Sequence, residues 1–246
     1  MILHLKIPLT PSETDVIEHI VCAANEMNVE VFMVGAMARI ILLEKVYGRP
    51  VSRASRDVDF AVVVENWESF EVVKKMLCEQ HAFIAIEGNM HRLRKKTPSP
   101  EDFYSIDLIP IGGVQDKFDR LAWPPDMQVI MSVAGFLDAL QSTVSIELKA
   151  GVVVKVASLP AIALLKIMAW KDRGKSTHGK DAIDLITICK QYQWAGNFER
   201  LFDEFSNQLE IYKDHDLVSA WMLGHDTALI SSPKNARDGF QSAAEH

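Results

Sequence analysis

The chain has 246 residues, of which 48% are hydrophobic and 24% are charged, and its formal net charge is −7. This length allows one large domain or two modest ones. No apolar run approaches the roughly 20 residues that span a bilayer, which argues against a membrane protein, and the acidic balance argues against a duplex DNA binder. The N-terminus lacks a secretory signal and the three cysteines are scattered, so we expect a cytoplasmic protein with free thiols.

The first 48 residues predict a helix, a strand and a second helix. Thr10, Pro11 and Glu13 have the pattern of a helix start, and apolar residues follow at helical spacing, namely Val16, Ile17, Ile20, Val21 and Ala24. The segment VEVFMVG at 29–35 predicts a short strand that ends at Gly35. Residues 36–48 predict the second helix, which Gly48 closes.

The middle of the chain predicts the rest of a mixed sheet. An apolar strand begins at Asp57, and an amphipathic helix follows at 67–80. Later strands are predicted as a pair around a Glu-Gly-Asn turn within 83–96, a single strand at 102–110 that Pro110 stops, and a hairpin at 143–157.

From residue 158 onward the apolar spacing is helical. We predict helices at 158–173, 180–192, 198–212 and 216–225. The segment 231–246 is small and polar, and we expect it to be flexible. The sequence therefore predicts an α+β protein, with a mixed β-sheet and flanking helices at 1–157 and an α-helical domain at 158–230.

Two aspartates open the strand that starts at residue 57, in a setting where aspartate is depleted. Side chains two apart on a strand project from the same face, so Asp57 and Asp59 would point together, with Val58 buried on the other side. A divalent cation relieves the repulsion between two carboxylates, and Mg²⁺ favours carboxylate and phosphate oxygens. The alternative is an Asp-x-Asp that caps a turn or binds Arg53 or Arg56.

A third acid, Asp107, has the same setting in the strand predicted at 102–110. If the two strands are neighbours, three carboxylates converge on one site. Such a site holds two Mg²⁺ ions in enzymes that displace phosphoryl or nucleotidyl groups in line.

Gly35 ends a strand and opens a helix, which would present free backbone N–H groups to a triphosphate. A plain connection between the two elements is the alternative. Two basic segments, 91–96 and 171–180, would line a local groove, although a solvated charged face accounts for either one alone. The run GKST at 174–177 lacks the earlier glycine and the preceding strand of a P-loop.

The ordered motifs VGAMAR at 34–39, RDVDF at 56–60 and SIDLIP at 105–110 resemble the DNA polymerase β-type nucleotidyltransferase superfamily. Within it, the chain is most similar to the AbiEii-type abortive-infection nucleotidyltransferases, which include toxins of toxin–antitoxin pairs. The positions that match their motifs are Arg53, Ser55, Asp57 and Asp59, followed in the helical half by Lys166, Arg173, Lys175, Asp181 and Asp184. The resemblance covers most of residues 30–190 and implies a nucleotidyltransferase-type sheet.

The resemblance implies Mg²⁺-dependent transfer of a nucleoside monophosphate from an NTP to a hydroxyl, with release of pyrophosphate. The acceptor would be RNA, a protein or a small molecule, and an antitoxin-like partner protein is also implied. Two Mg²⁺ ions would be bound by Asp57, Asp59 and Asp107, and Asp181 would orient or deprotonate the acceptor. The nucleotide would be bound by Gly35, Ala36, Arg39, Arg53, Ser55 and Lys166.

Ala36 departs from the family pattern, which has a second glycine or a serine at this position. A lost hydroxyl contact would weaken nucleotide binding by about 1 kcal/mol. The alternative function is therefore a catalytically weak nucleotide-binding or partner-binding protein on the same fold, and phosphodiester hydrolysis is a third. Lys166 and Asp181 also have a purely structural interpretation. Lys166 would extend its ammonium from an apolar helix to solvent, and Asp181 would interact favourably with the dipole of the helix in whose first turn it lies.

Overall fold

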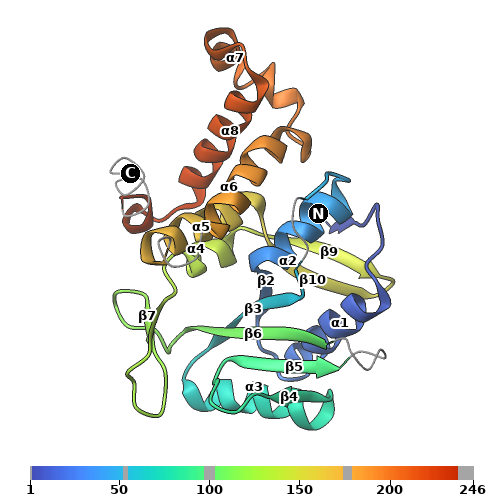
Figure 1. Cartoon of the computed structure of the whole chain (residues 1–246), viewed down its shortest axis with the longest axis vertical. Helices are drawn as coiled ribbons and strands as arrows, with labels where there is room; N and C mark the ends of the chain where they lie inside the picture. Colours follow the sequence, from blue (N-terminus) through green and yellow to red (C-terminus); the bar gives the residue numbers. More distant parts are fainter. Residues whose placement is uncertain (1, 52–54, 97–102, 174–178, 238–246) are drawn as a thin grey trace.

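The computed structural model describes residues 2–51, 55–96, 103–173 and 179–237 (Figure 1). Its main sheet is mixed and has the strand order β1-β9-β10-β2-β3-β6-β5-β4. The strands of this sheet are β1 (Ile2–His4), β2 (Val31–Val34), β3 (Asp57–Val64), β4 (Phe83–Ala85), β5 (Arg92–Lys96), β6 (Phe103–Gly112), β9 (Thr143–Lys149) and β10 (Val152–Ala157). A separate two-stranded sheet pairs β7 (Arg120–Ala122) with β8 (Ile130–Ser132).

Helices of the first half accompany the main sheet. They are α1 (Pro11–Glu26), α2 (Gly35–Ile40), which continues as the π-helix η1 (Ile41–Val46), α3 (Trp67–Gln80) and α4 (Phe136–Gln141). The predicted capping box opens α1, since the Thr10 hydroxyl accepts from the backbone N–H of Glu13, whose carboxylate accepts from the N–H of Thr10. The five apolar positions predicted for this helix are all buried.

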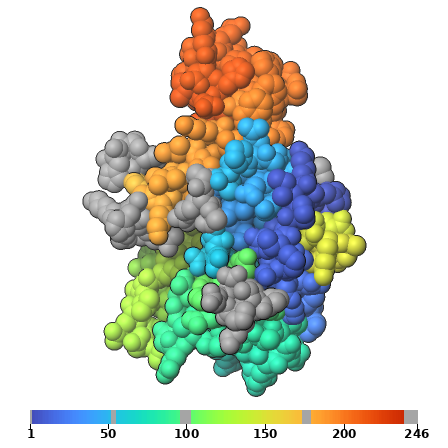
Figure 2. Space-filling view, turned by 45° about the vertical axis from the view of Figure 1, so that its right-hand side comes forward, coloured from blue at the N-terminus to red at the C-terminus, as the bar shows by residue number. Residues whose placement is uncertain are grey.

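The second half of the chain is helical, as predicted, and lies over one side of the sheet (Figure 1). It contains α5 (Leu159–Arg173), α6 (Lys180–Gln191), η2 (Tyr192–Trp194), η3 (Glu199–Leu201), α7 (Ser206–Tyr212) and α8 (His215–Ile230). Figure 2 shows α7 and the adjoining end of α8 protruding from the body of the molecule. The α+β class with a mixed sheet and a helical second half is therefore confirmed.

The prediction that Pro110 stops its strand is wrong, because β6 continues to Gly112. The backbone N–H of Leu108 donates to the carbonyl of His91, just before β5 begins. Backbone groups two residues apart on a strand point to the same side, so the nitrogen of Pro110 faces chain that precedes the start of β5. Proline costs no sheet hydrogen bond there, and β6 keeps its pairing with β3 on the other side.

The predicted helix at 198–212 is also wrong in part, since a 3-10 turn at η3 and a separate helix α7 replace it. Arg200 in the turn binds Asp226 of α8 and Glu204. Leu201 and Phe205 are buried. These tertiary contacts outweigh the helical spacing of the aromatic residues.

The segment expected to be flexible from residue 231 is held in place over its first part. Residues 233–237 form a helical turn. The carboxylate of Asp138 in α4 accepts hydrogen bonds from the backbone of Ser232 and the amide of Asn235. In the described parts of the chain, no helix combines the length and apolar character that crossing a bilayer requires.

Candidate active site

The parallel pairing of β3 with β6 brings the three predicted acids together. Asp59 is paired directly with Asp107, and Asp57 lies opposite Ser105. Val58, between the two acids of β3, is fully buried, so Asp57 and Asp59 lie on the opposite face from it. The condition for the three acids to converge, that their strands be neighbours, is therefore met.

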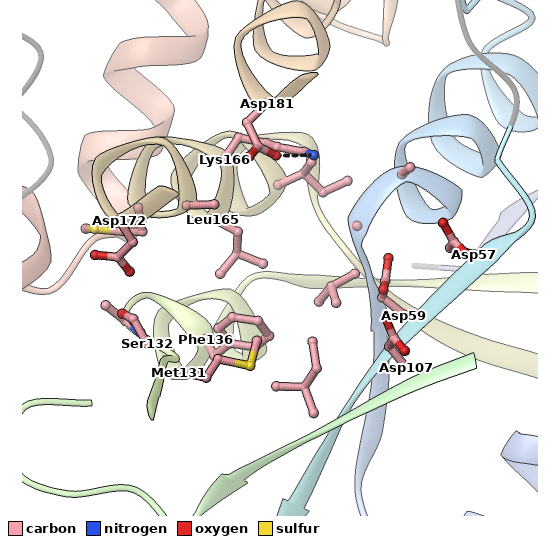
Figure 3. A pocket seen from close by; sticks show the side chains of 18 of the residues that line it. Asp57, Asp59, Asp107, Met131, Ser132, Phe136, Leu165, Lys166, Asp172 and Asp181 are labelled. Carbon is pink, nitrogen blue, oxygen red and sulfur yellow. Dashed lines mark hydrogen bonds and ion pairs between the residues drawn. The ribbon is translucent and has the colours of Figure 1, made fainter. Parts of the chain in front are cut away.

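The acids border a cavity of about 690 Å³ (Figure 3). One wall comes from the sheet and the start of α2, and the facing wall comes from α5 and α6. The sheet wall carries Gly35, Ala36, Ser55, Asp57, Asp59, His91, Arg92 and Asp107, and the helical wall carries Ile162, Leu165, Lys166, Met168, Ala169, Asp172, Lys180 and Asp181. An apolar region around Met131 and Phe136 lies away from the three acids (Figure 3).

Gly35 allows α2 to start directly against Asp59. Its φ is +74°, a backbone conformation that glycine adopts without strain. A Cβ at this position would lie 2.0 Å from Oδ2 of Asp59. Glycine is therefore required here both by the backbone conformation and by the space that the carboxylate takes.

Arg92 of β5 covers Asp107. Its Nε donates to Oδ1 and its Nη2 to Oδ2 of Asp107, both at 2.6 Å. This fork-to-fork pair is a strong, charge-assisted contact. Arg92 also lines the cavity. The sequence placed Arg92 only in a basic segment, and the β5–β6 register that sets it opposite Asp107 was not visible from spacing.

Lys166 and Asp181 meet on the helical wall. The Lys166 ammonium lies 2.9 Å from Oδ1 of Asp181 and 2.8 Å from Oδ2 of Asp184. Asp184 also pairs with Arg39 of α2 at 3.2 Å, and both side chains are almost fully buried. This network, formed by Arg39, Asp184, Lys166 and Asp181, links the two halves of the chain.

The pKa of Asp59 is raised to about 7, chiefly by burial and then by the nearby negative charges of Asp107 and Asp57, while Lys166 and Arg92 act in the opposite direction. A carboxyl with a pKa near neutrality in a cavity typifies functional sites. The raised pKa means that the ionised form of Asp59 is disfavoured in this cavity, and a nearby cation would stabilise that form.

The other predicted residues are placed as follows. Ser55 and Ala36 line the cavity, and the Ser55 hydroxyl accepts from the backbone N–H of Asp57. Arg39 is fully buried and is not among the residues that line the cavity. Arg53 and Lys175 lie outside the described residues.

The family's sequence model for the nucleotidyl transferase AbiEii toxin of type IV toxin–antitoxin systems matches residues 24–231. The chain belongs to this family. The AbiEii match includes the sheet from β2 onward and the helical half, and with them every described residue of the cavity. No curated protein matches the sequence.

Several solved structures resemble this AbiEii family member. An antigenic nucleotidyltransferase-like protein from Paracoccidioides brasiliensis is 16% identical, with 87% of this chain and 93% of that chain covered and a TM-score of 0.49. ANT(2")-Ia in complex with adenylyl-2"-tobramycin is 18% identical, with coverage of 80% and 98% and a TM-score of 0.43. The Thermotoga maritima CCA-adding enzyme complexed with tRNA is 16% identical, with coverage of 90% and 53% and a TM-score of 0.28. Since these TM-scores are below 0.5, the family assignment depends on the sequence model.

Proposed function

We propose that this AbiEii family member transfers a nucleoside monophosphate from an NTP to a hydroxyl acceptor and releases pyrophosphate. The observation that carries the proposal is the position of the three acids, Asp57, Asp59 and Asp107, across one cavity from Lys166 and Asp181. Nucleotidyl transfer requires charge neutralisation and alignment of the reacting groups more than covalent catalysis. A wall of carboxylates facing a wall with a cation and a further carboxylate meets that requirement.

The carboxylates suit Mg²⁺ in their chemistry, because hard divalent cations prefer oxygen ligands. Asp59 supports this fit, since the charges of Asp57 and Asp107 help to raise its pKa, and a bound cation would remove that repulsion. Among the described residues, no group of three or more acidic, histidine or cysteine side chains is arranged to hold a metal ion. The fit therefore requires that Asp107 be released from Arg92, and two bound Mg²⁺ ions remain part of the proposal. Such ions would supply electrophilic activation of the triphosphate.

The residues of the chain itself would bind and orient the nucleotide. The backbone of Gly35 and Ala36 lines the cavity beside Asp59 and would donate N–H groups to phosphate oxygens. Ser55 would contact the same phosphates from the start of β3. Lys166 would stabilise the negative charge of the phosphates from the helical wall, where the carboxylates of Asp181 and Asp184 fix its position.

Asp181 would orient the acceptor hydroxyl and accept its proton. A new bond then forms between the acceptor oxygen and the α-phosphorus, and the bond from that phosphorus to the bridging oxygen breaks. The electron pair leaves with pyrophosphate. We leave the acceptor open between RNA, a protein and a small molecule, and an antitoxin-like partner is proposed from the family description.

The test is incubation of the protein with each α-labelled NTP, Mg²⁺ and fractionated cell extract. We expect one fraction to contain a labelled acceptor, with no labelling in EDTA or with the Asp59→Asn variant. Release of free labelled nucleotide without a labelled acceptor would instead indicate a hydrolase. Nucleotide binding without any transfer would indicate the catalytically weak alternative, which the contact of Arg92 with Asp107 and the presence of Ala36 favour.

A further inference from the structure

Arg92 completes a row of charged side chains across three adjacent strands. Asp59 of β3 is paired with Asp107 of β6, and Asp107 is paired with Arg92 of β5. The order of these strands in the sheet is β3-β6-β5. The guanidinium thus balances the charge of the middle carboxylate at the edge of the cavity.

The contact of Arg92 with Asp107 competes with any cation for the same ligand. Both oxygens of Asp107 accept from Arg92, at 2.6 Å each, so one lone pair of each oxygen is occupied and the positive guanidinium lies where it repels an incoming cation. The side chain of Asp107 is 15% exposed and that of Arg92 is 36% exposed. Asp107 is therefore fixed in the wall, while Arg92 has access to solvent and to the cavity.

A guanidinium that leaves Asp107 has a second class of partner within the same cavity. Its planar fork binds phosphate as well as carboxylate oxygens, through two parallel N–H donors. Arg92 lines the cavity together with Gly35 and Ser55, where we place the triphosphate. No other charge on the sheet wall is positive among the described residues that line the cavity, apart from His91 when it is protonated.

We infer that Arg92 is an exchangeable counter-ion. It neutralises Asp107 while the site holds no cation, and it binds the phosphates of the nucleotide once a divalent cation takes Asp107. This inference rests on the proposed function, because it assumes the carboxylate site for the cation. It adds a nucleotide-binding residue that also sets the affinity for the metal.

Two binding measurements on the Arg92→Gln variant test the exchange. Mn²⁺, a cation that carboxylates bind in the same way as Mg²⁺, is titrated into the nucleotide-free protein by calorimetry. A non-hydrolysable NTP is then titrated in the presence of saturating Mn²⁺. We expect Mn²⁺ to bind about 10-fold more tightly to the variant, since its competitor is gone, and the nucleotide about 10-fold more weakly.

Opposite changes in the two affinities separate this role from a purely structural one, because damage to the site would weaken both. Arg92→Lys keeps the charge without the fork and should lie between wild type and Arg92→Gln in both titrations. Arg94→Gln is the matched control, since Arg94 is exposed two residues along β5, stacks on Phe103 and does not line the cavity. It should change neither affinity.

Two outcomes overturn the inference. The first leaves the proposed function standing, and the second overturns it as well. If wild type binds Mn²⁺, Asp59→Asn abolishes that binding, and Arg92→Gln leaves it unchanged or weaker, the role of Arg92 alone is wrong. If neither wild type nor Arg92→Gln binds Mn²⁺, the proposed carboxylate site and the proposed function fail together with the role of Arg92.

Discussion

Asp59 and Asp107 occupy directly paired positions on the parallel strands β3 and β6. The two residues are far apart in the sequence, and only the parallel register brings their carboxylates to the same edge of one cavity. Neighbouring carboxylates of this kind are unfavourable without a cation. Their pairing is the central feature of the proposed site.

Replacement of any one of the three acids is expected to remove transfer activity. Asp57→Asn, Asp59→Asn and Asp107→Asn each keep the size of the side chain while they remove a negative charge that would hold cations in the proposed site. We expect a loss of roughly 100-fold or more in the initial rate with an α-labelled NTP. Asp116→Asn is the control, since Asp116 pairs with Arg120 outside the cavity. Full activity in all three variants would show that the site is elsewhere.

Gly35→Ala is expected to damage both the fold and the site, and Gly48→Ala provides the comparison. Both glycines have a positive φ, but a Cβ at Gly48 meets nothing within 4 Å, whereas one at Gly35 meets Asp59. Gly48→Ala should cost about 1 to 3 kcal/mol for the backbone conformation alone. Gly35→Ala should cost a further 1 to 3 kcal/mol or so for overpacking, measured by urea unfolding. Equal losses would mean that the contact with Asp59 has no energetic weight.

The pH dependence of stability should reflect the raised pKa of Asp59. The folded, metal-free protein has a pKa of about 7 at this carboxyl, against roughly 4 when unfolded. Between these values the folded state holds the proton and the unfolded state does not. The contribution of Asp59 to stability is therefore present below about pH 4 and is lost as the pH rises through about 7.

Asp59→Asn removes this titration and isolates its effect. In EDTA, the variant should gain stability relative to wild type by roughly 1.4 kcal/mol for each pH unit between 5 and the folded-state pKa of about 7, and by little above it. Thermal unfolding at several pH values measures the difference. A difference between the two proteins that stays constant over this range would show that the pKa of Asp59 is not raised.

Lys166→Gln is expected to weaken nucleotide binding by about 10-fold or more, because it removes the cation that we propose faces the phosphates. It also leaves Asp181 and Asp184 without their shared ammonium, so the unfolding free energy of the variant must be measured alongside. Lys171→Gln, from the exposed side of the same helix, is the matched control. An unchanged nucleotide affinity in Lys166→Gln would exclude phosphate binding by Lys166.

Local patterns predicted those elements whose signal lies within a few residues. The capping box of Thr10 and the alternation around Val58 depend on neighbours in sequence, and both are found in the structure. The short strand β1 escaped prediction because it gains its pairing from β9, more than 100 residues away. Pro110 was misjudged because the cost of a proline depends on which strand lies beside it.

The acids of the candidate site were predictable because aspartate is unexpected in an apolar strand. The cations were harder to place. Arg92 is paired with Asp107 only through the β5–β6 register, and Arg39 is buried against Asp184 of a later helix. Both pairings are set by tertiary structure, so the sequence identified these residues as basic but did not indicate which acids they contact.

The contact between Arg39 and Asp184 limits how this molecule can admit a substrate. Arg39 belongs to α2 and Asp184 to α6, and both side chains are almost completely shielded from water. Separation of the two halves would break this buried ion pair, at a cost in free energy that thermal fluctuations rarely supply. Nucleotide should therefore enter the cavity, and product leave it, through its existing opening, without separation of the two halves of the chain.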